Sequence, residues 1–225
     1  MAKPNQEEQA FSFRAAFEDD AEFRQYGQNA LAIFALALYL RLEDPHEFAA
    51  AAITEGPNDK KVDICHLDEL EGRVIIAQSY LAVEWAKPAA PANKASDLCT
   101  AIAWLLSASE DHIPPHLLTR AQEIRRALRS RSLRRIELLF IHNCMESDNV
   151  KAELKTAADA ARDMAASLTP DGQDSIVVSY RELGLIEIED LFRSRQREIL
   201  VDDRIEVPAA SFLPEEGDEC TAILA

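Results

Sequence analysis

Two neighbouring segments carry polar side chains of the kind that hold a metal ion in hydrolytic enzymes. The segment Lys60–Leu67 ("KKVDICHL") contains Asp63, and the segment Arg73–Val83 ("RVIIAQSYLAV") contains Gln78. A carboxylate and an amide oxygen are ligands that Mg²⁺ accepts, with water and a substrate phosphate filling the other positions. An ion held there would polarise a phosphate and lower the pKa of a bound water. The pair predicts metal-dependent phosphodiester hydrolysis, if the fold brings the two side chains together.

The position two residues after Gln78 complicates that prediction. A lysine at this position would orient the attacking water and neutralise charge, but the sequence holds Tyr80, which hydrogen-bonds without carrying a charge near pH 7. Lys94 is our first candidate for a displaced lysine, because it lies at a predicted helix start, where the backbone dipoles favour anions. Lys61 is the second candidate.

The site depends on the register of a predicted β-hairpin. Both segments are rich in β-forming residues, and an acidic link that ends in Gly72 separates them. If Asp63 lies opposite Gln78, then Asp68 lies opposite Arg73 as a favourable charge pair. A shift of one residue would put Asp63 and Gln78 on opposite faces of the sheet. The alternative interpretation is that both are ordinary polar groups on a sheet surface.

The elements around this hairpin alternate in a way that predicts an α/β fold. Helices are expected through residues 28–42 and at 45–56, 92–109, 115–131, 148–168 and 184–195; further strands are expected at 135–144, 175–180 and 198–207. Strands and helices that alternate after a hairpin imply a mixed central sheet with parallel members, flanked by helices. We expect residues 1–20 to be a flexible segment and residues 21–225 to form one domain.

Composition limits the partners of the chain. The 225 residues carry a formal charge of −16, which argues against a surface built for non-specific binding of nucleic acid, so any such contact must be local or supplied by a metal. The longest apolar run, Ala30–Leu40, is too short to span a bilayer, and the N-terminus lacks the apolar core of a secretion signal. We therefore expect a cytoplasmic protein with reduced cysteines and no membrane contact.

One basic stretch stands out in this acidic chain. Residues 120–135 ("RAQEIRRALRSRSLRR") contain seven arginines. Such a stretch could bind phosphates. The interpretation we favour is a solvated helix face that pairs with acidic groups on the surface.

Several blocks of the sequence resemble, in order, the N-terminal region of the abortive-phage-infection-resistance (AIPR) family. The resemblance runs from about Phe48 to the C-terminus, and the blocks that carry it are "GPNDKKVDI", "VIIAQSY", "APANKASDLCTAIAWLLS", "IELLFIHNCMES", "NVKAELKTAADAARDMA" and "RSRQREILVDD". The family is associated with bacterial defence against phage. Its N-terminal region resembles the restriction-endonuclease fold of the PD-(D/E)xK nucleases.

The resemblance implies a role for each site residue. Asp63 falls on the metal-binding aspartate, Gln78 on the second acidic-or-amide position, and Tyr80 on the position of the lysine. It also implies that the chain is the N-terminal part of a longer protein, whose C-terminal domains would be partners; the apolar ending "DECTAILA" is consistent with this. Two hypotheses follow: a magnesium-dependent nuclease module, or a catalytically inactive scaffold that serves recognition or homo-oligomerisation.

Overall fold

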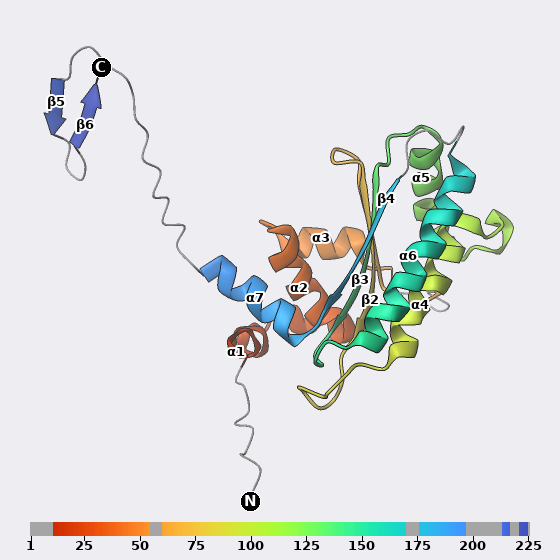
Figure 1. Ribbon diagram of the computed structural model, residues 1–225, viewed down its shortest axis with the longest axis horizontal. Helices are drawn as coiled ribbons and strands as arrows, with labels where there is room; N and C mark the ends of the chain where they lie inside the picture. The colour runs from red at the N-terminus through yellow and green to blue at the C-terminus, as the bar shows by residue number, and fades with distance from the viewer. Residues whose placement is uncertain (1–10, 55–59, 170–175, 197–212, 217–220, 225) are drawn as a thin grey trace, which may run out of the picture.

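The computed structural model describes residues 11–54, 60–169, 176–196, 213–216 and 221–224. A four-stranded sheet stands between two layers of helices (Figure 1). The helices are α1 (Ser12–Asp19), α2 (Ala30–Leu40), α3 (Pro45–Ala52), α4 (Ala92–Ile102), α5 (Pro115–Arg129), α6 (Asp148–Leu168) and α7 (Leu185–Gln196). The strands of the sheet are β1 (Ile64–Asp68), β2 (Arg73–Tyr80), β3 (Arg135–His142) and β4 (Val177–Leu183). A separate antiparallel pair consists of β5 (Leu213–Glu216) and β6 (Thr221–Leu224).

The sheet is mixed, as the order of elements predicts. Its strands lie in the order β1-β2-β3-β4; β1 and β2 are antiparallel, while β2, β3 and β4 are parallel to one another. Parallel neighbours require a long crossover. Helices α4 and α5 provide it between β2 and β3, and α6 provides it between β3 and β4. The α/β fold class with a mixed, helix-flanked sheet is therefore confirmed.

The central strands are buried on both faces. Along β2, Val74 and Ile76 point into the core under α4, α5 and α6, while Ile75 and Ala77 point into the core under α1, α2, α3 and α7. Figure 1 shows the same division, with α4–α6 on one side of the sheet and α1–α3 and α7 on the other. This explains why β2 and β3 read as continuous apolar runs, because both faces of these strands contact helices.

Local capping fixes where two of the helices begin. The Asp44 carboxylate accepts hydrogen bonds from the backbone N–H groups of His46 and Glu47 at the start of α3. The Ser147 hydroxyl accepts from the backbone N–H of Val150 at the start of α6. These caps satisfy N–H groups that have no partner within a helix.

Five of the seven arginines in residues 120–135 are exposed, as the favoured interpretation expects, but Arg125 and Arg120 make contacts within the fold. Arg125 is buried, and its guanidinium donates to the carbonyl oxygens of Leu105 and Ala108, both at 2.8 Å. These carbonyls belong to the π-helical turn Ala103–Ser107 after α4 and to the residue that follows it. Arg120 likewise donates to the carbonyl oxygen of Ala51. Two of the seven arginines thus tie elements of the fold together.

The N-terminal segment also differs from the prediction. Residues 1–20 were expected to be flexible, yet Ser12–Asp19 form α1 and the Phe13 side chain is fully buried. The Ser12 hydroxyl and the Phe13 backbone N–H both donate to the Glu189 carboxylate on α7. Residues 1–10 and the strand predicted at 198–207 lie outside the described residues.

Candidate active site

The hairpin has the register that the site requires. Leu67 pairs with Val74, and Asp68 pairs with Arg73. The Arg73 guanidinium lies 3.4 Å from the Asp68 carboxylate, as the predicted charge pair. Asp63 directly precedes β1, and the same register places it opposite Gln78.

Asp63 and Gln78 are in direct contact. The Gln78 Nε2 atom donates to Asp63 Oδ2 at 2.5 Å, and the backbone N–H of Ser79 donates to the same oxygen at 2.7 Å. Gln78 is only 6% exposed, and its Oε1 atom accepts no hydrogen bond from the described residues. A buried acceptor without a donor costs about 1–3 kcal/mol. That amide oxygen is therefore a group that a ligand could satisfy.

These two side chains lie on the wall of a cavity of about 320 Å³. The residues that line it are Gln28, Asn29, Lys61, Val62, Asp63, Gln78, Ser79 and Lys94. It lies at the carboxyl end of β2, where open α/β sheets place their binding sites. A hydrogen bond of 2.9 Å from the Ser79 hydroxyl to the carbonyl oxygen of Gln28 joins this strand end to the segment before α2.

Both candidate lysines reach the same cavity. Lys94 lies in the first turn of α4, and its backbone N–H donates to the carbonyl oxygen of Pro91 at 2.9 Å. The ammonium groups of Lys61 and Lys94 lie 3.5 Å and 4.0 Å from the Asp97 carboxylate. Asp97 thus lies between two cations and holds them near the cavity. Because both lysine side chains are well exposed, each pair contributes little to stability.

Tyr80 neither lines this cavity nor brings a charge to it. Its half-buried side chain packs against the core formed by α4, α5 and α6. The position that the resemblance assigns to a lysine is therefore an ordinary packing position here. Among the described residues that line the cavity, the cationic side chains are those of Lys61 and Lys94.

The donor set fits a hard cation better than a transition metal. Asp63 and Gln78 offer one carboxylate and one amide oxygen, and among the residues that the structure describes no three His, Cys, Asp or Glu side chains gather as a metal cluster. Magnesium commonly binds through one or two protein oxygens, with water and phosphate completing its shell. For both side chains to hold one ion, the Gln78 amide must present Oε1 to it in place of the hydrogen bond from Nε2. Because Oε1 has no partner among the described residues, turning the amide breaks only the hydrogen bond from Nε2 to Asp63.

Four residues at or beside the cavity were missed by the sequence analysis. Asp97 follows Lys94 by three positions on a predicted helix, and that spacing is a recognisable signal for an ion pair. Ser79 contributes its backbone N–H, which no side-chain pattern reveals. Gln28 and Asn29 reach the site through the packing of the segment before α2 on the strand end, for which the sequence gives no local signal.

No protein-family model, curated protein or solved structure matches this chain. In the part of the chain that the structure describes, no helix is both long and apolar enough to cross a membrane.

Proposed function

We propose that the chain is a metal-dependent phosphodiesterase module that hydrolyses nucleic acid, with Mg²⁺ held by Asp63 and Gln78. The contact between these two side chains, on a cavity that also carries two lysine ammonium groups, is the observation that supports this proposal. Carboxylate and amide oxygens attract a cation, and ammonium groups attract phosphate. One small cavity therefore offers ligands for both the ion and its anionic substrate.

The roles of the side chains follow from their chemistry. Among the described residues that line the cavity, Asp63 supplies the only carboxylate, so it is the principal metal ligand. Gln78 adds a neutral oxygen. A bound Mg²⁺ supplies Lewis acidity toward the phosphate and lowers the pKa of a water ligand. Lys94 and Lys61 would orient the substrate phosphate and stabilise its developing charge.

A catalytically inactive scaffold is the alternative function. Tyr80 favours it, because the lysine that the PD-(D/E)xK pattern places on this strand is replaced by a packing residue. Asp97 also favours it, since it neutralises part of the charge of Lys61 and Lys94. In this case the domain would serve recognition or oligomerisation within a larger protein.

The biological setting is part of the proposal. The resemblance to the AIPR family supports a role in cytoplasmic defence against phage, as the N-terminal nuclease-like domain of a longer protein with a restriction-endonuclease-like core. Three free cysteines among the described residues, Cys65, Cys99 and Cys144, are in keeping with a reducing compartment.

Thermal unfolding with and without Mg²⁺ or Mn²⁺ tests the metal site. An ion that binds only the native state at a hundred times its dissociation constant adds about 2.7 kcal/mol to the free energy of unfolding. We expect this gain for the wild type and its loss in Asp63→Ala. Asp63→Asn keeps an acceptor for the Ser79 N–H and serves where the alanine variant folds poorly. Asp159→Ala, which removes an exposed carboxylate from α6, is the matched control.

Cleavage assays then separate the two functions. Plasmid DNA and single-stranded RNA should be cut by the wild type with Mg²⁺, and Lys94→Ala should reduce the rate more than Lys61→Ala. Metal binding without cleavage of either substrate would favour the scaffold. Identical metal response of the wild type and Asp63→Ala would remove Asp63 as a ligand and, with it, the proposed phosphodiesterase.

A further inference from the structure

The outer edge of β4 is open in the described structure. Because β4 is the last strand in the order of the sheet, only β3 pairs with it among the described residues. The backbone N–H of Val177 donates to the carbonyl oxygen of Arg134 on the β3 side. Backbone groups alternate between the two sides of a strand, so every second residue after Val177 also faces β3. The residues whose N–H and C=O groups point outward are Val178, Tyr180 and Glu182.

This edge lacks several of the features that prevent strand addition. Natural edge strands are commonly blunted by proline, by charged side chains, especially lysine, or by a bulge, and of these β4 carries only the charged residues Arg181 and Glu182, the latter buried. The sequence of β4, "VVSYREL", contains neither proline nor lysine, and the strand keeps unbroken register with β3 from Val177 to Leu183. Large apolar side chains beside the edge are well exposed: Val177 by 57%, Tyr180 by 41% and Ile186 by 46%. The edge can therefore accept a further strand.

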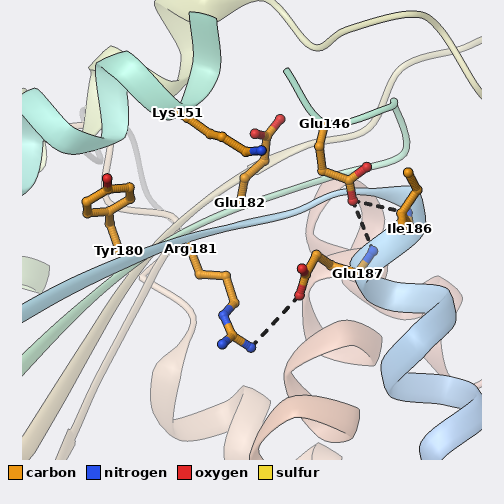
Figure 2. A pocket seen from close by; sticks show the side chains of 7 residues that line it. All are labelled: Glu146, Lys151, Tyr180, Arg181, Glu182, Ile186 and Glu187. Carbon is orange, nitrogen blue, oxygen red and sulfur yellow. Dashed lines mark hydrogen bonds and ion pairs between the residues drawn. The ribbon is translucent and has the colours of Figure 1, made fainter. Parts of the chain in front are cut away.

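A cavity of about 320 Å³ adjoins the carboxyl end of this edge. The residues that line it are Glu146, Lys151, Tyr180, Arg181, Glu182, Ile186 and Glu187 (Figure 2). Lys151 belongs to α6, and Ile186 and Glu187 begin α7, so the cavity receives side chains from both faces of the sheet around β4. A strand paired with β4 would run directly into it.

Glu146 lines this cavity and carries one carboxylate oxygen without a partner among the described residues. Its Oε1 atom accepts hydrogen bonds of 3.0 Å from the backbone N–H groups of Ile186 and Glu187, as the dashed lines of Figure 2 show. Its Oε2 atom is buried and accepts no hydrogen bond from the described residues. Gly184 makes this packing feasible, because a Cβ atom there would lie 2.8 Å from Glu146 Cδ and from His142 Cε1. A cationic donor is the strongest hydrogen-bond partner for the unpaired Oε2 atom of Glu146.

With Lys151 and Arg181 set against three glutamates, the lining of the cavity has a net formal charge of −1, a small preference for a cation. Three carboxylates and two cationic side chains line it. The Glu182 carboxylate already accepts from His142 Nε2 at 3.1 Å and from the Ser147 backbone N–H. Arg181 lies 3.9 Å from Glu187, so these two largely offset each other. The formal charge of −16 on the whole chain adds a long-range attraction for basic partners.

We propose that the β4 edge and this cavity bind an extended basic peptide segment of a partner protein. The segment adds a strand to the sheet through the outward backbone groups of Val178, Tyr180 and Glu182. A lysine or arginine side chain of the segment enters the cavity and donates to Glu146 Oε2. Tyr180 and Ile186 contact its apolar side chains. The inference does not depend on the proposed nuclease function, because none of these residues lines the cavity around Asp63.

Three labelled hexapeptides provide the probes. The first alternates lysine and valine, the second alternates glutamate and valine, and the third alternates lysine and proline, which retains the charge but loses backbone donors. Fluorescence anisotropy with the full chain should show binding of the lysine–valine peptide at least about tenfold tighter than binding of the other two. Amide hydrogen exchange should slow at Val178, Tyr180 and Glu182 when this peptide binds. The amides of Ser179 and Arg181, which face β3, are the internal reference.

Glu146→Gln tests the anchor. Glutamine retains an oxygen for the N–H groups of Ile186 and Glu187 but replaces the acceptor at Oε2 with a donor. Because the variant loses a hydrogen bond to a charged group, affinity for the lysine–valine peptide should fall about tenfold or more. Glu84→Gln, which removes an exposed carboxylate elsewhere, should leave it unchanged.

Three results would overturn the proposal. The first is equal affinity for the three peptides, or no binding of any. The second is an unchanged affinity in Glu146→Gln. The third is slow exchange at Val178, Tyr180 and Glu182 before any peptide is added. In that case the mass in solution would tell whether a second copy or the chain itself covers the edge.

Discussion

At the residue scale, the orientation of one amide group decides what the candidate site can bind. Gln78 presents Nε2 to Asp63 and leaves Oε1 without a donor among the described residues. The Nε2 group donates a hydrogen bond to the carboxylate and repels a cation. The Oε1 atom attracts a cation and repels the carboxylate. Without a metal, the Asp63 carboxylate therefore has hydrogen-bond donors. The Oε1 atom of Gln78 has none among the described residues, so it would gain a partner from a ligand.

Replacing Gln78 with glutamate makes this balance measurable. Gln78→Glu puts a second carboxylate beside Asp63 in a buried position, so we expect a loss of about 1–3 kcal/mol in the free energy of unfolding at pH 7 without metal. Repulsion raises the pKa of the pair above the unfolded value, so the loss should shrink as pH falls toward 4. Added Mg²⁺ should stabilise Gln78→Glu more than the wild type. Urea unfolding at several pH values, with and without Mg²⁺, checks this.

The control for this variant is Gln122→Glu on α5. Gln122 donates to Glu110 at 2.7 Å, but in an exposed position, so the same exchange should cost under about 0.5 kcal/mol there. If Mg²⁺ stabilised Gln78→Glu no more than the wild type, Gln78 would not be a metal ligand.

The cysteine thiols should be protected by burial. Burial raises the pKa of Cys65 to about 12 and also raises the pKa of Cys144. The thiolate is the reactive form, so both thiols should resist iodoacetamide at pH 8 in the native protein and react fully in urea. Peptide mass spectrometry would quantify each site. Rapid native alkylation of Cys65 would contradict the described core.

At the element scale, α1 depends on one distant carboxylate. The Ser12 hydroxyl, the Phe13 backbone N–H and the Arg193 guanidinium all donate to Glu189, at 2.6, 3.0 and 2.6 Å. Burial by itself would raise the pKa of Glu189, but these hydrogen bonds together outweigh it and hold the pKa below its ordinary value. The anionic form of one side chain on α7 therefore fixes the N-terminal helix.

Glu189→Ala should release α1. It leaves the buried N–H of Phe13 without an acceptor, so we expect a loss of about 1–3 kcal/mol and faster proteolysis before α2. Since the pKa of Glu189 is lower in the folded state, its contribution is present above the ordinary value of 4.5 and is lost as pH falls through the folded value. Denaturant titrations at pH 7 and pH 3 should show the variant and wild type converging at low pH. Glu18→Ala, which breaks an exposed pair with Arg14, should show neither effect.

The turn of the hairpin depends on Gly72. Its φ is +59°, and a Cβ atom there would lie 2.4 Å from the carbonyl oxygen of Ser132. Its own carbonyl oxygen accepts from the backbone N–H groups of Arg134 and Arg135, at the start of β3. Gly72 thus joins the hairpin that carries Asp63 and Gln78 to the rest of the sheet.

Gly72→Ala should therefore destabilise the protein more than Gly27→Ala. Both glycines have positive φ, but a Cβ atom at Gly27 would meet nothing within 4 Å. Strain is common to both variants, and only Gly72→Ala adds the backbone clash, for which we expect a further loss of about 1–3 kcal/mol. Thermal melts of the two variants give this difference directly. Equal melting temperatures would show that the turn relaxes around the added methyl group.

The sequence predicted those elements whose signals are local. The hairpin register followed from the charges of Asp68 and Arg73 and from strand alternation, and it correctly placed Asp63 against Gln78. The apolar run predicted as a strand at 135–144, which forms β3 (Arg135–His142), was an equally local signal. The α1 helix was missed because its anchor, Glu189, lies 176 residues from Phe13. The burial of Arg125 was missed because the carbonyls it satisfies are exposed only by the π-helical turn after α4.

At the scale of the whole molecule, charge limits how nucleic acid can approach. A net charge of −16 repels phosphates at long range, and the ammonium groups at the candidate site, those of Lys61 and Lys94, share the carboxylate of Asp97. A divalent ion at Asp63 and Gln78 would change the sign of the local potential. Binding of nucleic acid should therefore require the metal, which a basic protein would not need.

The need for a metal ion in nucleic-acid binding can be measured directly. Fluorescence anisotropy with a labelled 20-nucleotide single strand should show little binding in EDTA and clear binding with Mg²⁺. The slope of log Kd against log salt concentration reports phosphate contacts, at roughly 0.7 per contact for single strands. The double variant Lys61→Gln/Lys94→Gln should flatten that slope by about 1.4, whereas Lys87→Gln/Lys155→Gln, with the same loss of exposed charge, should not. Binding that persists in EDTA, or equal slopes for the two variants, would place the contact elsewhere, because neither the ion nor these lysines would then hold the strand.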